Sequence, residues 1–372
     1  MTIKIPKQKL LDIAETLKPF IPKNTLVPIV ENVLVEYNKG DSEVTLRATD
    51  LNNTCIYRLS VLDADVDGFG KYCFDLNLIS EYVKTIPDEL IEIDFSDNGL
   101  SLIRKEGNFI MQLEDSKDYP IKSIPEISDS VKLSSKDIST QIKHVLDNTP
   151  PVTGGIPISA NYVYIVKDDD LNCTVINSYN KKYSSFMMYK VSKNIPTIAI
   201  SQENCVKLNH FLLKKDDISL NIEGIDVILN TKDTTVIIRG TDDFKSNNYA
   251  FLLNTKFDKS AVIPRDEFID KVNRVGISIK NTVEDPFVEL SCVNGVLSIV
   301  AQDTNYVISA TETIELGSES DEFEINLNIK ALIRVLKTLT TDTFTIKISG
   351  INMLIEDAND GHIIAMSRVV KY

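Results

Sequence analysis

The side chains that could perform catalysis or hold a metal are scattered through this chain. The histidines His144, His210 and His362 lie far apart in the sequence, and none has a second ligand at metal-binding spacing. The acidic run 168–170 falls where a hairpin turn is expected, so we interpret it as a solvated turn. Asp50 precedes two asparagines, and we predict that it caps a turn instead of acting as a catalytic carboxylate.

The short motifs of common catalytic sites are also missing from the sequence. The pair Gly154-Gly155 is not followed by the Gly-Lys-Ser/Thr of a phosphate-binding loop, and we find neither a Gly-x-Ser-x-Gly motif nor a dinucleotide fingerprint. The cysteines are odd in number and never form a Cys-x-x-Cys pair, which argues against disulfides and zinc sites. They are Cys55, Cys73, Cys173, Cys205 and Cys292. We therefore predict a non-enzyme with no cofactor and no metal.

The bulk composition is that of a globular protein. The chain has 372 residues, of which 43% are hydrophobic and 25% charged, and no apolar run is long enough to span a bilayer. Residues 1–4 lack the apolar stretch of a secretory signal, so we expect a cytoplasmic protein. Domains usually contain about 100 to 200 residues, so this length predicts two to four of them.

A helix followed by several strands recurs along the chain. The run 7–20 has apolar residues spaced three and four apart, as on one face of a helix, and the β-branched segments 27–37, 44–48 and 55–61 follow it. Five further helix-period runs lie 59 to 69 residues apart, counted from the apolar residue that precedes each. They are 76–86, 134–147, 201–215, 264–280 and 326–339. This spacing predicts an internally repeated α+β architecture.

The repeat and its interruptions predict the domain boundaries. The segment 121–130 has no periodicity and contains proline, serine and acidic residues, so it indicates a boundary near residue 128, and a second polar segment indicates another near residue 255. We therefore expect three similar domains of two units each, at 1–128, 129–255 and 256–372.

Charge is distributed unevenly along the sequence. The net charge is −14, yet the six helix-period runs together carry +7, so the remainder carries −21. If the six helices shared one surface, that surface would attract a polyanion while the rest of the molecule repelled it. The alternative is that these lysines and arginines are ordinary solvated residues of helix faces.

Several short segments, in this order and spacing, resemble one family, the bacterial beta sliding clamp, which is the processivity factor of the replicative DNA polymerase. The likeness covers the whole chain and departs from the family most strongly near 177–183 and 366–368. It is compatible with a cellular or a viral origin. The segments are 25–29, 32–34, 48–51, 118–120, 261–264, 274–275 and the Met-containing C-terminal strand.

The resemblance implies a DNA clamp fold in which two three-domain subunits form a ring, with helices lining the hole and antiparallel sheets outside. Twelve helices packed about 10 Å apart make a circumference of roughly 120 Å and a bore of roughly 38 Å, which admits duplex DNA. Such a ring holds DNA topologically, whatever its sequence, and slides along it. The implied partners are double-stranded DNA, the replicative polymerase, a clamp loader, other proteins with clamp-binding peptides, and a second copy of the chain; no membrane is involved.

The resemblance and the charge count together suggest three sets of site residues. The DNA-binding set is Lys23, Asn24, Lys143, Lys207, Lys214, Arg274, Lys330, Arg334 and Lys337. The set for a partner peptide is Ala160, Val175, Asn177, Lys182, Tyr183, Val262, Ile364, Met366, Ser367, Arg368 and Val369. The dimer set is Phe109, Met111 and Ile277.

Two other classes of protein remain open at this point. One is a repeated α+β interaction scaffold that never encircles DNA. The other is a hydrolase with an unrecognised site, which the lack of a paired nucleophile and base argues against.

Overall fold

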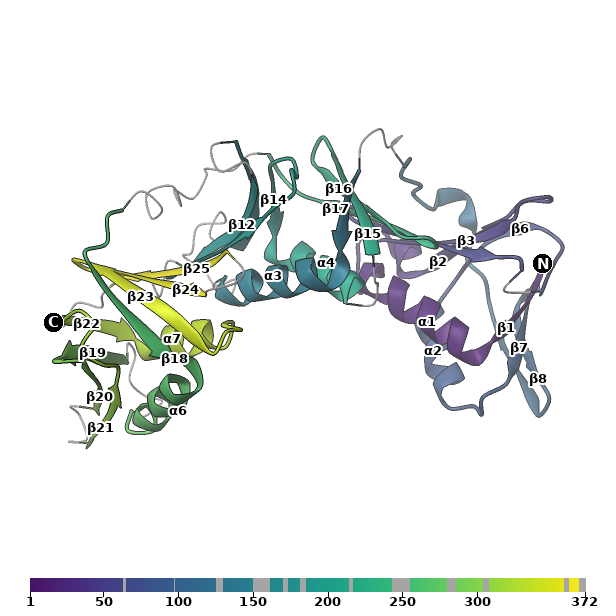
Figure 1. The fold of residues 1–372 in the computed structure, drawn as a ribbon. Helices are drawn as coiled ribbons and strands as arrows, with labels where there is room; N and C mark the ends of the chain where they lie inside the picture. Colours follow the sequence, from purple (N-terminus) through teal and green to yellow (C-terminus); the bar gives the residue numbers. More distant parts are fainter. Residues whose placement is uncertain are drawn as a thin grey trace. The chain divides into compact units, whose positions relative to one another are not determined.

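A computed structural model gives the structure of this protein (Figure 1). It describes residues 1–62, 65–96, 98–124, 130–149, 161–169, 173–180, 185–213, 217–242, 255–279, 286–303, 308–357 and 361–367. Among these residues, no helix is both long and apolar enough to cross a membrane.

All six helix-period runs form α-helices, which confirms that part of the sequence prediction. Two of them begin directly after a proline, and in two others the side chain of the residue before the helix, Asp75 or Asn328, accepts a hydrogen bond from a backbone N–H of the first turn. The helices are α1 (Lys7–Leu17), α2 (Leu76–Lys84), α3 (Ser135–Asn148), α4 (Gln202–Leu212), α6 (Arg265–Gly276) and α7 (Ile329–Leu336).

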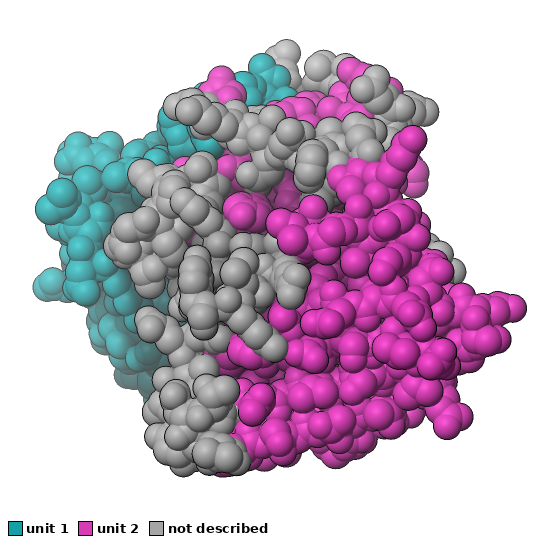
Figure 2. Space-filling model, turned by 90° about the vertical axis from the view of Figure 1, so that its left-hand side faces the viewer, with its two compact units in different colours: residues 1–139, 206–241 teal, residues 140–205, 242–372 magenta. Residues whose placement is uncertain are grey.

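The described residues divide into two compact units, coloured separately in Figure 2. Unit 1 comprises Met1–Ser139 and Val206–Thr241, and unit 2 comprises Thr140–Cys205 and Asp242–Tyr372. The three-domain division expected from the repeat remains a prediction.

Unit 1 contains two antiparallel sheets. Sheet A has the order β5-β1-β7-β8-β9, and sheet B has the order β10-β15-β16-β17-β4-β3-β2-β6. Helices α1 and α2 pack together, with Ile13, Leu17, Ile79 and Val83 essentially inaccessible to solvent. The strands of sheet A are β1 (Thr2–Pro6), β5 (Asp65–Asp67), β7 (Leu90–Ser96), β8 (Gly99–Arg104) and β9 (Gly107–Met111). Those of sheet B are β2 (Val33–Tyr37), β3 (Glu43–Thr49), β4 (Thr54–Ser60), β6 (Gly70–Phe74), β10 (Val131–Ser134), β15 (Asp217–Glu223), β16 (Asp226–Asn230) and β17 (Thr234–Arg239).

Unit 2 repeats this organisation. Sheet C has the order β14-β11-β12-β13-β25-β24-β23-β18, and sheet D has the order β21-β20-β19-β22. Helices α6 and α7 pack together, and Phe268 of α6 meets Phe344 edge to face. The strands of sheet C are β11 (Tyr162–Asp168), β12 (Cys173–Asn180), β13 (Ser185–Val191), β14 (Ile198–Ser201), β18 (Lys259–Pro264), β23 (Thr343–Ser349), β24 (Asn352–Asp357) and β25 (His362–Ser367). Those of sheet D are β19 (Phe287–Val293), β20 (Val296–Asp303), β21 (Ile308–Glu315) and β22 (Phe323–Asn328).

One expected strand is only partly correct. The segment 27–37 was predicted as a single strand, but Pro28–Glu31 forms a 3-10 helix, η2, and only Val33–Tyr37 is extended. Proline at the first position of this short helix has the backbone angle that the helix needs, and it has no N–H to offer a sheet. Two further 3-10 helices, η1 (Lys18–Phe20) and η3 (Ser116–Asp118), connect other elements.

Candidate functional site

Most of the positive charge counted in the helix-period runs lies outside the helices themselves. Within their observed bounds, five of the six helices carry no net charge, and α7 carries +2. The remaining excess of the helix-period runs comes from residues that follow a helix: Lys18, Lys214, Lys215, Lys280 and Lys337. Lys18 and Lys337 are the C-cap residues of α1 and α7. A cation there interacts favourably with the helix dipole, which gives both lysines a structural reason to be there that is independent of DNA.

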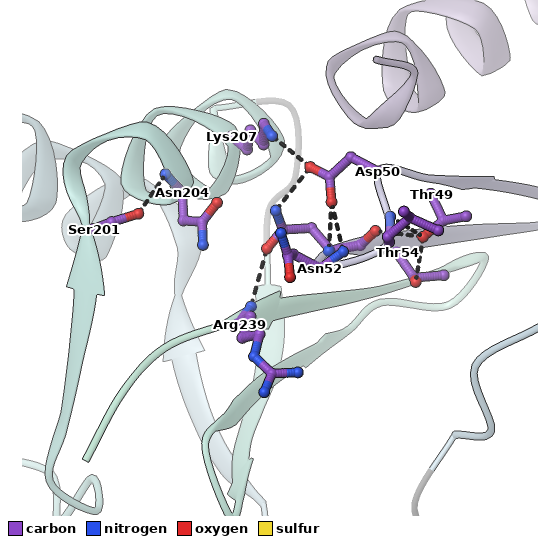
Figure 3. Close-up of polar contacts among 10 residues, drawn as sticks. Thr49, Asp50, Asn52, Thr54, Ser201, Asn204, Lys207 and Arg239 are labelled. Atoms are coloured by element: carbon purple, nitrogen blue, oxygen red, sulfur yellow. Dashed lines mark hydrogen bonds and ion pairs between the residues drawn. The ribbon is translucent and has the colours of Figure 1, made fainter. Parts of the chain in front are cut away.

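Lys207, on α4, is held by a carboxylate within unit 1 (Figure 3). Its Nζ donates to Asp50 Oδ2 at 2.5 Å, and the two side chains are 16% and 12% exposed. Asp50 Oδ1 also accepts bonds from the backbone N–H groups of Asn52 and Asn53, so its prediction as a turn cap is confirmed. Burial acts to raise the pKa of Asp50, but the bonds from Lys207 and Asn53 outweigh it and hold the pKa below its ordinary value. The positive charge of Lys207 is therefore already neutralised.

The other cations differ in how freely they are presented. In unit 1, Lys23 and Asn24 are exposed in the loop after η1, where Asn24 has a positive φ of 55°. In unit 2, Arg274 of α6 donates to both carboxylate oxygens of Glu312, at 2.9 and 3.3 Å, which raises its pKa.

Three lysines of unit 2 are exposed without an ion pair among the described residues, and Arg334 of α7 is half-buried. The charges of Lys143 and, to a smaller extent, Arg334 act to lower the pKa of the Asp147 carboxyl. Burial nevertheless raises the pKa of Asp147 overall. The three lysines are Lys143, Lys330 and Lys337. Lys214 lies outside the described residues.

The predicted peptide-binding residues are divided between two faces of sheet C. Cross-strand partners share a face of a sheet, and Asn177 is opposite Met188, which is opposite Ile363. Val175 and Asn177 therefore lie on one face, the outer face of sheet C, whereas Ile364 and Met366 alternate with Ile363 and lie on the face toward the helices. Both of the latter are buried.

The outer face of sheet C carries a cluster of apolar side chains from strands on both sides of the expected boundary near residue 255. Phe257 packs against this cluster. Asn177 beside it is 1% exposed, and among the described residues neither its Nδ2 nor its Oδ1 has a hydrogen-bond partner. The cluster consists of Cys173, Val175, Phe186, Met188, Leu354, Ile363 and Ala365.

Of the remaining residues predicted to bind a peptide, only Val262 and Ser367 are among the described residues. Val262, on β18, is 57% exposed. Ser367 ends β25, and only its backbone is described. Ala160, Lys182, Tyr183, Arg368 and Val369 lie outside the described residues.

The predicted dimer residues lie on the edge strand of sheet A or directly after the helix that packs on the edge strand of sheet D. In unit 1, β9 is an edge strand of sheet A, and its Phe109 stacks on Tyr82 of α2 with ring centroids 4.7 Å apart. Ile110 faces the opposite way and is 63% exposed, a residue that the sequence did not single out, while Met111 is half-buried. In unit 2, Ile277 directly follows α6 and is 83% exposed.

Two histidines that are distant in the sequence come together in unit 2. His144 Nδ1 lies 2.6 Å from the Tyr189 hydroxyl, and the Tyr189 ring stacks on His362 with centroids 4.1 Å apart. His362 approaches Asp357, which accepts bonds from the threonines after α7. No cluster suited to a metal ion occurs among the described residues, and we interpret this group as a packing contact between α3 and sheet C.

Comparison with known proteins identifies the fold. Residues 1–125 match the family model described as DNA polymerase III beta subunit, N-terminal domain. Among solved structures, the DNA polymerase III subunit beta from Pseudomonas aeruginosa is 18% identical, with a TM-score of 0.87 and 100% of both chains covered. The DNA polymerase sliding clamps from Bacillus subtilis and Caulobacter crescentus are each 16% identical over 100% of both chains, with TM-scores of 0.87 and 0.85. No curated protein matches.

The fold is therefore that of a DNA sliding clamp. Its first 125 residues match the model of the DNA polymerase III beta subunit N-terminal domain, and the whole chain has the fold of that subunit. The expected resemblance to the bacterial beta sliding clamp and the expected α+β clamp fold are confirmed, at the low identities of a divergent relative.

Proposed function

We propose that this chain is a DNA sliding clamp, a ring of two copies that encircles duplex DNA and tethers the replicative polymerase. The observation that carries the proposal is the likeness to beta clamps over all 372 residues, together with the family match of residues 1–125. In this function the protein is a cytoplasmic, non-catalytic scaffold that needs no cofactor. Its three domains would be 1–128, 129–255 and 256–372.

Contacts to DNA would come from cations that are exposed and form no ion pair among the described residues. Lys23, Lys143, Lys330 and Lys337 meet this condition, whereas Lys207 and Arg274 are each paired with an acid. A few contacts to phosphate, none to bases, allow a ring to slide. Asn24 and Arg334 would contribute polar contacts beside these lysines, and Lys214 remains a proposed contact.

Partner peptides would bind beside the outer face of sheet C. One solved relative, a DnaN sliding clamp from Pseudomonas aeruginosa, is bound to griselimycin. In this chain, Val175 and Asn177 lie on the outer face and Val262 is exposed on β18, whereas Ile364 and Met366 are buried on the opposite face of β25. That strand ends at Ser367, and Arg368 and Val369 follow in the sequence. Together with Ala160, Lys182 and Tyr183, these residues would select peptides of the polymerase, the clamp loader and other partners.

Ring closure would join β9 of one copy to β21 of the other. Both are edge strands in the described sheets, and an edge strand exposes backbone groups that pair readily with another strand. Phe109 and Met111 on β9 would then lie beside Ile277. Because the same contact occurs twice in a closed dimer, no edge of this kind would remain open.

The decisive experiment is retention on nicked circular DNA. The chain is loaded with a clamp loader, free protein is removed, and the DNA is cut once with a restriction enzyme. A topological ring stays on the circle and is lost on linearisation, and blocking both ends of the linear DNA should restore retention. An interaction scaffold that does not encircle DNA would show the same retention on circular and linear DNA.

A further inference from the structure

The edge strand β21 in unit 2 is accompanied by α6. It is the last strand of sheet D on that side, and no described strand pairs with its outer side. Helix α6 packs along β20 and β21, and Figure 1 shows the three elements together. Side chains of α6 can therefore reach around the edge of the sheet.

The hydrogen-bond alternation of an antiparallel pair identifies which groups of β21 face outward. Leu316 N donates to Gly295 O, and these two residues lie directly opposite each other. Hydrogen-bonded pairs recur every two residues, so Ile314 also exchanges backbone hydrogen bonds with β20, whereas Thr313 and Thr311 are in non-hydrogen-bonded pairs. The N–H and C=O groups of Thr311 and Thr313 consequently point to the free side.

One of these outward carbonyls is already occupied. Lys271 of α6 donates from Nζ to Thr313 O at 2.6 Å. The same ammonium group is held by Glu267, one helical turn earlier, at 2.5 Å, and the Lys271 side chain is only 17% exposed. A hydrogen bond from a charged donor is stronger than one from a neutral donor.

We propose that Lys271 closes the free edge of β21 and that a strand of a second copy pairs there only after displacing this lysine. Lysine at a sheet edge is a recognised means of preventing unwanted strand pairing. Here the lysine blocks a particular acceptor, which a backbone N–H of the incoming strand would need. Glu267 would hold the displaced ammonium group, so its charge would not be left unpaired.

The incoming strand would be β9 of the second copy, so this inference rests on the proposed ring closure. Counted from the two-residue turn at Lys105 and Glu106, the backbone groups of Asn108 and Ile110 point to the free side of β9. They provide the N–H donors that would replace the ammonium of Lys271.

The test is the dissociation constant of the dimer, measured by sedimentation equilibrium. Lys271→Met retains most of the aliphatic length and removes the ammonium group, so it should tighten the dimer about tenfold, because both junctions of a ring are relieved. Lys271→Arg keeps a cationic donor and should behave as the wild type does. Lys347→Met is the matched control, because Lys347 pairs with Glu356 at 2.7 Å on sheet C, away from β21.

Any result in which Lys271→Met is not a tighter dimer than the wild type contradicts the inference, including one in which neither protein dimerises. Lys271→Ala provides a second variant if the methionine variant fails to fold. Retention on circular DNA separates the two proposals. If the wild type is retained on circular DNA but Lys271→Met has the same dimer dissociation constant as the wild type, only the role of Lys271 is refuted. If Lys271→Met forms the tighter dimer but neither protein is retained on circular DNA, only the clamp function is refuted.

Discussion

Replacing Lys207 by methionine tests whether a cation predicted to contact DNA is instead a structural one. In unit 1 this lysine pairs with Asp50, which also holds the turn at Asn52 and Asn53 (Figure 3). We expect Lys207→Met to lower the free energy of unfolding and to leave the salt dependence of DNA binding unchanged. The physical reason is that a phosphate would have to displace Asp50 to reach this ammonium group.

The magnitude follows from the burial of the pair. Removing one partner of a fully buried pair costs about 3–5 kcal/mol, and an exposed pair contributes about 0.2–1 kcal/mol. The two side chains are 16% and 12% exposed, and Asp50 retains three bonds from the turn after Lys207 is removed. A loss of about 1–2 kcal/mol is therefore expected.

Denaturant unfolding of the wild type, Lys207→Met, Asp50→Asn and the double variant measures this coupling directly. Because the folded-state pKa of Asp50 is lowered, the coupling should be present at neutral pH and lost as the pH falls below about 4. In parallel, the slope of the logarithm of the DNA association constant against the logarithm of the salt concentration should be smaller in magnitude by about 0.9 for Lys330→Met if Lys330 contacts one phosphate. A Lys207→Met protein with a reduced slope and unaltered stability would contradict the structural role of Lys207.

Three further predictions concern stability and assembly. Burial lowers the pKa of His144 to about 4, so below about pH 6.5 the unfolded chain binds more protons than the folded one. The free energy of unfolding should therefore decrease as the pH falls from about 6.5 to about 4. His144→Gln should remove this pH dependence in a series of unfolding curves. Asn148 is completely buried, and its side chain forms hydrogen bonds with the hydroxyls of one serine on β12 and one on β13. Asn148→Ala should therefore lower the free energy of unfolding by about 2–4 kcal/mol, measured with denaturant. A decrease of less than about 1 kcal/mol would contradict these hydrogen bonds. Ile277 is 83% exposed beside the proposed junction. Ile277→Glu should raise the dissociation constant of the dimer about tenfold or more, as measured by sedimentation equilibrium. The control is Ile351→Glu, at a 59% exposed site in a hairpin turn, which should leave that constant unchanged.

The helices and most strands were predictable because their signals are local. Apolar residues three and four apart on α1 bury Leu10, Ile13 and Leu17 in the structure, and the same spacing held for the other five helices. Pro28 is an instructive exception, since the β-branched residues around it favoured a strand while proline itself started a 3-10 helix.

The partners of the charged residues were not predictable from the sequence. Lys207 and Asp50 are 157 positions apart, and nothing local to either residue indicates the other. Arg274 and Glu312 are 38 positions apart and meet only because α6 packs on β21. A count of charges along the chain therefore overestimates the positive charge that a polyanion could use.

The sequence by itself determined that six helix-and-strand units recur, that catalytic and metal-binding motifs are missing, and that the resemblance is to beta clamps. These properties depend on residue types and on their spacing within short segments. Only the tertiary structure decided which cations are already neutralised, which face of sheet C carries Val175 and which carries Ile364, and that Lys271 covers the edge of β21. Those outcomes depend on strand register and on helix packing, which bring together residues that no local pattern relates.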